Sequence, residues 1–119
     1  MKDFRNLQVW QKARNLTLKI YQVTAGFPRS ELYGLSSQLR RASSSIGANL
    51  AQGCGRKFNA EFAQSCNIAA GEASELENHL LLAMDLRYIT PEEYTELNER
   101  TIEIKRMLFG LQQRLTADR

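Results

Sequence analysis

The sequence predicts an all-α protein, an up-down-up-down antiparallel four-helix bundle with left-handed packing. In four long segments apolar residues recur at alternating steps of three and four, which is typical of amphipathic helices. Short connections join these segments and force consecutive helices to run antiparallel. No segment alternates apolar and polar residues as a strand would. The mean apolar spacing of about 3.5 residues favours left-handed crossing near +20°.

The first two helices are expected over residues 6–25 and 31–53. Asn6 is a suitable N-cap for the first helix, and Ser30 is suitable for the second, with Glu31 favouring the helix dipole. Gly26 and Pro28 end the first helix. The apolar stripes are Val9, Ala13, Leu16, Ile20 and Val23, then Leu35, Leu39, Ala42, Ile46 and Leu50.

Small residues form a second stripe on the second helix, one turn round from its apolar stripe. Ser43, Gly47 and Ala51 lie on it, and such a face allows another helix to come close. The alternative is a merely weak helix, since Gly costs about 1 kcal/mol in a helix interior. Gly53 and Gly55 are expected to end this helix.

The remaining helices are expected over residues 60–86 and 91–115. Asn59 is the expected N-cap of the third. Thr90, Pro91 and Glu93 form the pattern of a capping box with proline at the first helical position, which predicts the start of the fourth. The apolar stripes are Phe62, Cys66, Ala69, Ala73, Leu76, Leu80 and Ala83, then Tyr94, Leu97, Thr101, Ile104, Leu108, Leu111 and Leu115.

Length and composition are those of one globular domain spanning residues 1–119. Apolar residues make up 43% of the chain and charged residues 24%, which are ordinary values. Two cysteines, Cys54 and Cys66, are too few for a disulfide framework and indicate a reducing compartment. The N-terminus has no signal-peptide pattern and no apolar run is long enough to span a membrane, so we expect a cytoplasmic location.

Charge is distributed unevenly along the chain. Residues 1–57 contain ten Lys or Arg against Asp3 and Glu31, a net charge of +8. Residues 58–119 contain six basic and eleven acidic side chains, a net charge of −5. Two explanations remain open: the halves complement each other within or between subunits, or the basic half faces nucleic acid.

Polar residues on the second and third helices are predicted to form a structural network across the bundle. A turn centred near Arg56 places Arg40 level with Glu72 and Ser45 level with Asn67. Glu72 and Glu75 are three residues apart and share a helix face. The candidate members are Gln38, Arg40, Ser45, Asn49, Glu72 and Glu75.

The sequence contains no recognisable catalytic or metal site. A di-metal bundle site needs a Glu-x-x-His motif on each of two helices, and this chain has the single histidine His79. One histidine and a turn cysteine do not make a nucleophile–base pair. The glycine-rich turn GCGRKFN lacks the spacing of a phosphate-binding loop. We therefore expect no catalytic residues, no metal, no cofactor and no enzymatic activity.

Aromatic and basic residues mix on the first helix, where Trp10, Lys12, Arg14, Lys19 and Tyr21 lie together. This mixture can bind nucleic acid by stacking and phosphate contact. The alternative is that the aromatic residues belong to the core and the basic ones are simply solvated. The candidate nucleic-acid-binding residues are Lys12, Arg14, Arg56 and Lys57.

Nearly the whole chain resembles a known family. The segments that carry the resemblance are LQVWQKA, FPRSELYGLSSQLRRASSSIGANLAQGCGR and IAAGEASELE. They resemble the bacterial proteins encoded by reading frames in intervening sequences of 23S ribosomal RNA genes. The family usually has Pro at the position of Gly47 and Glu at that of Gln52. Its characteristic residues match Gln38, Arg40, Ser45, Asn49, Gly53, Glu75 and Leu76.

The resemblance implies the bundle, no known catalysis, and ring-like homopentamers in some members. A related branch, the accessory proteins of diversity-generating retroelements, engages nucleic acid and a reverse transcriptase. The sequence thus favours a non-catalytic, oligomeric binding module that contacts RNA or an RNA–protein complex through a basic surface. The alternative is a protein–protein adaptor or accessory subunit without nucleic-acid binding.

Overall fold

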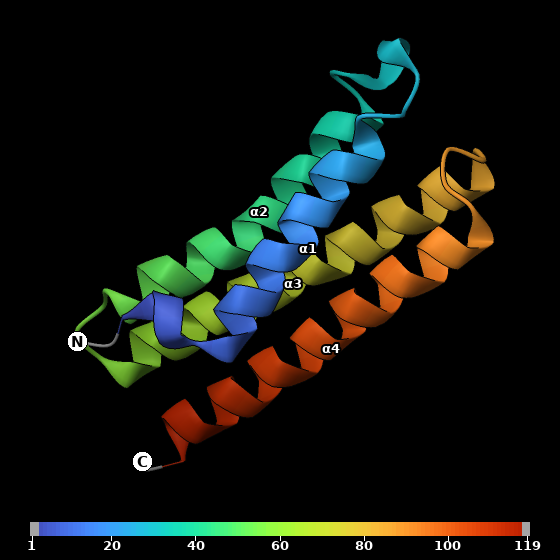
Figure 1. The fold of residues 1–119 in the computed structure, drawn as a ribbon. Helices are drawn as coiled ribbons and strands as arrows, with labels where there is room; N and C mark the ends of the chain where they lie inside the picture. The colour runs from blue at the N-terminus through green and yellow to red at the C-terminus, as the bar shows by residue number, and fades with distance from the viewer. Residues whose placement is uncertain (1–2, 118–119) are drawn as a thin grey trace.

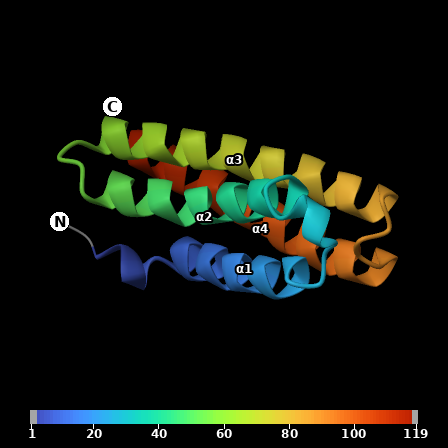
Figure 2. The ribbon, with the colours of Figure 1, turned by 90° about the horizontal axis from the view of Figure 1, so that it is seen from above.

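The computed structural model describes residues 3–117 and consists of four long helices with two short 3₁₀ turns (Figures 1 and 2). Each helix packs against the next in the chain, and the first and last helices also pack together, which closes a four-helix bundle of about 48 × 21 × 20 Å. No strand occurs within the described residues. The predicted all-α bundle is confirmed. The elements are η1 (Phe4–Asn6), α1 (Gln8–Thr24), η2 (Arg29–Glu31), α2 (Leu35–Cys54), α3 (Asn59–Asp85) and α4 (Pro91–Thr116).

The core is built from the four apolar stripes. Leu16, Ile46, Leu76 and Leu97 are completely buried, one from each helix. The stripes lie at the centre because burying them gains about 25 cal/mol per Å² of apolar surface. At the ends of the bundle Val23, Tyr94 and Leu115 are partly buried and pack against this core.

The start of α1 differs from the prediction. Asn6 belongs to η1 and does not cap α1, which begins at Gln8 after an extended Leu7. Asp3 instead caps η1, since its Oδ1 accepts a hydrogen bond of 2.9 Å from the Arg5 backbone N–H. The 3₁₀ turn thus takes the place of the first helical turn predicted for α1.

The start of α2 also differs, and the predicted Ser30 cap was wrong. Ser30 and Glu31 lie in η2, and α2 begins only at Leu35. Glu31 nevertheless acts on the helix terminus, because its Oε1 accepts a 3.0 Å hydrogen bond from the Leu35 backbone N–H. Its Oε2 accepts a 2.9 Å bond from the Tyr88 hydroxyl. One carboxylate therefore joins the α1–α2 connection to the α3–α4 connection.

The other two helix starts lie close to their predicted positions. Asn59 is the first residue of α3 and not its N-cap; Phe58 precedes it without a side-chain cap. The capping box of α4 is confirmed, because Thr90 Oγ1 accepts from Glu93 N at 3.0 Å and Glu93 Oε1 accepts from Thr90 N at 2.9 Å. The box fixes the chain direction after the α3–α4 turn.

Gly53 lies at a close contact between α2 and α3. It lies inside the last turn of α2 and is buried, so the helix ends after Cys54 and not at Gly53. A Cβ at Gly53 would lie 2.7 Å from Phe62 Cδ1 and 2.8 Å from Ser65 Cβ. Gly47 faces α1, where a Cβ would lie 3.4 Å from Trp10 Nε1, an ordinary contact. Packing therefore accounts for Gly53, whereas a Cβ would fit at Gly47, so that position does not distinguish close packing from a weak helix.

Gly53→Ala and Gly71→Ala form a matched pair that tests this approach. Alanine at Gly53 should lower the free energy of unfolding by about 1–3 kcal/mol, because Phe62 and Ser65 must move. A Cβ at Gly71 meets nothing within 4 Å, so the same change should raise stability by about 0.5–1 kcal/mol. Urea unfolding measures both, and stabilisation at both positions would contradict the proposed packing.

Candidate nucleic-acid interface

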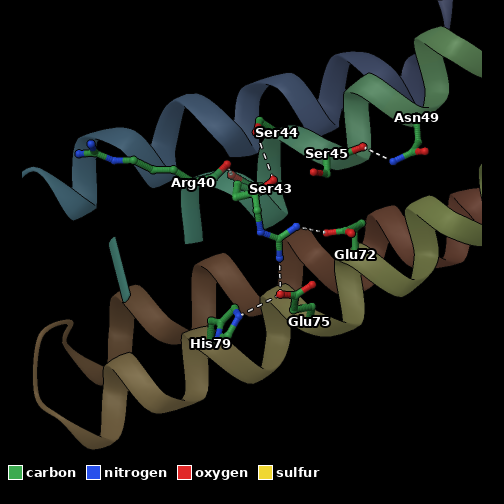
Figure 3. Close-up of polar contacts among 9 residues, drawn as sticks. Arg40, Ser43, Ser44, Ser45, Asn49, Glu72, Glu75 and His79 are labelled. Carbon is green, nitrogen blue, oxygen red and sulfur yellow. Dashed lines mark hydrogen bonds and ion pairs between the residues drawn. The ribbon is translucent and has the colours of Figure 1, made fainter. Parts of the chain in front are cut away.

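Arg41 of α2 forms a partly exposed ion-pair cluster with two carboxylates of α3, Glu72 and Glu75, which Figure 3 labels. Arg41 Nη1 lies 3.2 Å from Glu72 Oε2, and Arg41 Nη2 donates to Glu75 Oε1. His79 Nε2 lies 3.3 Å from the same Glu75 oxygen. The cluster links α2 to α3 with one guanidinium between two carboxylates.

The predicted partner Arg40 does not join this cluster. Its Nε donates a 2.8 Å hydrogen bond to Thr24 Oγ1, and its guanidinium lies 4.7 Å from the centre of the Tyr21 ring. The estimated register of α2 and α3 correctly brought this part of α2 level with Glu72. Successive residues of a helix differ by about 100° in direction, however, so Arg40 faces α1 and Arg41 faces α3.

The other predicted members on α2 make no bond to the cluster. Asn49 Nδ2 donates to the Ser45 backbone oxygen at 2.8 Å, a bond within α2. Gln38 is exposed near the start of α2. Arg41 and the His79–Glu75 contact were not predicted from the sequence, although the spacing of four between Glu75 and His79 places both on one helix face.

The cluster changes the titration of Glu75. The Arg41 guanidinium donates to the carboxylate and holds the pKa of Glu75 below its ordinary value of 4.5, partly offset by desolvation, with a further contribution from His79. The pKa of Glu31 is also lowered, first by the Leu35 N–H and then by the Tyr88 hydroxyl. Folding therefore favours the charged form of both Glu75 and Glu31.

The four residues predicted to bind nucleic acid do not form one continuous patch. Lys12 Nζ lies 3.3 Å from Glu103 Oε2 of α4. Arg14 lies two residues further along α1, about 200° round the helix, and its guanidinium lies 5.5 Å from the centre of the Trp10 ring. Arg56 and Lys57 are exposed in the α2–α3 connection.

Most of the described cations in residues 3–57, the basic half of the chain, form no ion pair within residues 3–117. Within residues 3–117, three of its cations form ion pairs: Arg5 with Asp3, Lys12 with Glu103, and Arg41 with Glu72 and Glu75. Its remaining described cations make no ion pair in that range and are Arg14, Lys19, Arg29, Arg40, Arg56 and Lys57.

The described residues offer little for covalent or metal chemistry. Burial raises the pKa of the Cys66 thiol to about 11, which keeps it protonated and unreactive near neutral pH. Among residues 3–117 no group of three or more His, Cys, Asp or Glu side chains is placed to hold a metal ion. Nor is any helix in this part of the chain both long and apolar enough to cross a membrane.

Comparison with known proteins identifies the family. The sequence pattern described as 23S rRNA-intervening sequence protein matches residues 5–110. The chain belongs to this family. A similar solved structure is a protein of unknown function from the S23 ribosomal protein family of Bacteroides thetaiotaomicron, with 30% identity and a TM-score of 0.79. The similarity covers 88% of this chain and 98% of that one. No curated protein sequence matches the chain.

Family membership supports the bundle and leaves the activity open, because the similar structure is itself described as having unknown function. Of the two positions at which the resemblance marks a departure, Gly47 faces Trp10, where an added Cβ would lie 3.4 Å from Nε1, and Gln52 is exposed near the end of α2.

A double-mutant cycle tests the ion-pair assignment. Arg41→Ala and Glu75→Gln should show a coupling of about 0.2–1 kcal/mol at pH 7, as expected for partly exposed pairs. The pKa of Glu75 is lowered on folding, so this stabilisation is present above its unfolded pKa and disappears as pH falls through the folded pKa. Urea unfolding at pH 7 and pH 3 measures the change.

Arg40→Ala combined with Glu75→Gln is the matched control for this cycle and should show no coupling, because Arg40 bonds to Thr24. Coupling to Glu75 through Arg40, and none through Arg41, would contradict the arrangement.

Proposed function

We propose that this chain is a non-catalytic, self-assembling binding module that contacts RNA through the basic surface of α1, α2 and the α2–α3 connection. The observation that supports this most strongly is the set of six cations in the N-terminal half without an ion-pair partner within residues 3–117. Unpaired surface Lys and Arg neutralise phosphates and release counterions, which is the main source of affinity for nucleic acid.

The order of the helices supports a one-sided distribution of this charge. α1 packs on α2 and α3 packs on α4, and the contacts α2–α3 and α1–α4 join these two pairs (Figure 2). Within residues 3–117, the half with α1 and α2 contains nine basic and two acidic side chains, a net charge of +7, and the half with α3 and α4 contains five basic and ten acidic ones, a net charge of −5. A one-sided charge of this kind attracts polyanions to the α1–α2 side.

The same charge separation favours association of identical chains. A basic side of one subunit can meet an acidic side of the next in a heterologous contact, and such contacts close into rings when the rotation allows it. The family resemblance makes the homopentamer the expected ring. Five chains of net charge +3 give an assembly of about +15, which would strengthen its attraction for RNA.

A protein–protein adaptor is the second candidate, favoured by the outer side of α4. Phe109 is 62% exposed there and lies beside Ile102 and Lys105 in a shallow hollow of about 450 Å³. Exposed aromatic residues of this kind are enriched in protein interfaces. This surface could serve a protein partner without involving the basic side.

The assembly has a direct test in the mass of the protein in solution. Light scattering with size-exclusion chromatography at micromolar concentration should give about five times the 13.6 kDa of one chain. High salt should weaken the assembly, because charge contributes to the contact. A monomer at every salt concentration would contradict self-assembly.

RNA binding is tested with short single-stranded oligonucleotides at 50 and 200 mM salt. Each phosphate contact contributes about 0.7 to the slope of log affinity against log salt, so the double variant Arg56→Ala/Lys57→Ala should lower the slope by about 1.4. Arg14→Ala should lower it by about 0.7. Lys12→Ala should have a smaller effect, because Glu103 already neutralises Lys12.

Arg100→Ala/Arg106→Ala removes the same charge from α4 and serves as the control, which should leave the slope near its original value. Affinity that does not respond to salt, or equal losses in both double variants, would contradict the proposed basic surface and favour the adaptor.

A further inference from the structure

A hollow of about 510 Å³ lies where the end of α1 and the α1–α2 connection meet the first turns of α2. Tyr21, Leu32, Tyr33 and Arg40 contribute to its lining. The connection projects beyond the end of the α1–α2 pair (Figure 1). The hollow is widely open to solvent.

Tyr33 is the unusual residue of this hollow. Its side chain is 93% exposed, so it contributes almost nothing to the core. Tyr21 is 47% exposed and Leu32 is 48% exposed, so both also present apolar surface to the hollow. Their clustering at one place provides flat and apolar surfaces on which a planar group can stack.

Arg40 supplies a positive charge beside these aromatic rings. Its Nε is fixed by Thr24, and its guanidinium lies 4.7 Å from the centre of the Tyr21 ring, which holds the side chain against α1. Its terminal Nη atoms make no hydrogen bond among residues 3–117 and can donate to an anion. A fixed guanidinium with free terminal donors suits a phosphate.

The surrounding charges leave Arg40 available. Arg41 also lines the hollow, but it is engaged with Glu72 and Glu75. The nearby carboxylate of Glu31 is held by the Leu35 N–H and the Tyr88 hydroxyl. Of the two arginines that line the hollow, Arg40 has no carboxylate partner within residues 3–117 and Arg41 has two.

We propose that this hollow binds an unpaired nucleotide of an RNA strand, with the base stacked on Tyr33 and a neighbouring phosphate bound by Arg40. This inference rests on the RNA-binding function proposed above and adds a preference for single strands. Stacking on aromatic side chains requires an unstacked base, which single strands offer and duplexes do not. The residues involved differ from the basic residues predicted from sequence.

The test compares a labelled single-stranded octaribonucleotide with a duplex of the same sequence by fluorescence anisotropy. The protein should bind the single strand more tightly at equal salt. Tyr33→Ala should weaken single-strand binding at least fivefold and leave duplex binding unchanged, since the ring on which the base stacks is lost. Tyr33→Phe should keep the original affinity, because it keeps the ring.

Phe109→Ala is the matched control, because it removes another exposed aromatic ring on a different helix. It should leave both affinities unchanged. Since Tyr33 is almost fully exposed, its replacement should not affect folding, and light scattering of the Tyr33→Ala protein checks that the assembly is intact.

Three outcomes would overturn the inference: unchanged single-strand affinity in Tyr33→Ala, equal losses on single strand and duplex, or a change in assembly mass that places Tyr33 in a protein contact. If these occur while Arg56→Ala/Lys57→Ala still lowers the salt slope, the proposed function stands and only this site is wrong. If the original protein binds neither RNA, both proposals fail.

Discussion

The close approach of α2 and α3 is the constraint on which the rest of the bundle depends. Gly53 allows it at one end, because any side chain there would overlap Phe62 and Ser65. Further along the pair, Ala42 of α2 and Ala73 of α3 are completely buried. Small side chains bring the backbones together, and close packing then fixes the register of the two helices.

This register determines where the polar and charged side chains lie. It brings Arg41 of α2 against Glu72 and Glu75 of α3, so these carboxylates are partly neutralised on the outer side of α2 and α3. α1 packs on the other side of α2, where Arg40 meets Thr24 and Tyr21. The consecutive arginines thus serve different sides of the bundle: one joins helices, and the other leaves donors available for a ligand.

Periodicity could predict the bundle and its core, because the spacing of apolar residues along each helix determines which of them are buried. Local side-chain chemistry likewise predicted the capping box at Thr90. The beginning of α2 could not be predicted in this way, since Glu31 caps it from four residues upstream and also binds Tyr88 in a distant turn. The choice between Arg40 and Arg41 required the rotation of α2 about its axis. The exposed hollow at Tyr33 depends on how the α1–α2 connection folds over the helix ends.

Native-state amide hydrogen exchange of the full chain tests most directly whether α2 and α3 are the frame of the structure. The slowest amides should lie in α2 and α3, around Ile46 and Leu76, and should exchange only through global unfolding. Amides of α1, the shortest of the four helices, should exchange through a smaller opening with a lower free energy. Protection of α1 equal to that of α2, or the slowest exchange in α1 or α4, would contradict this account.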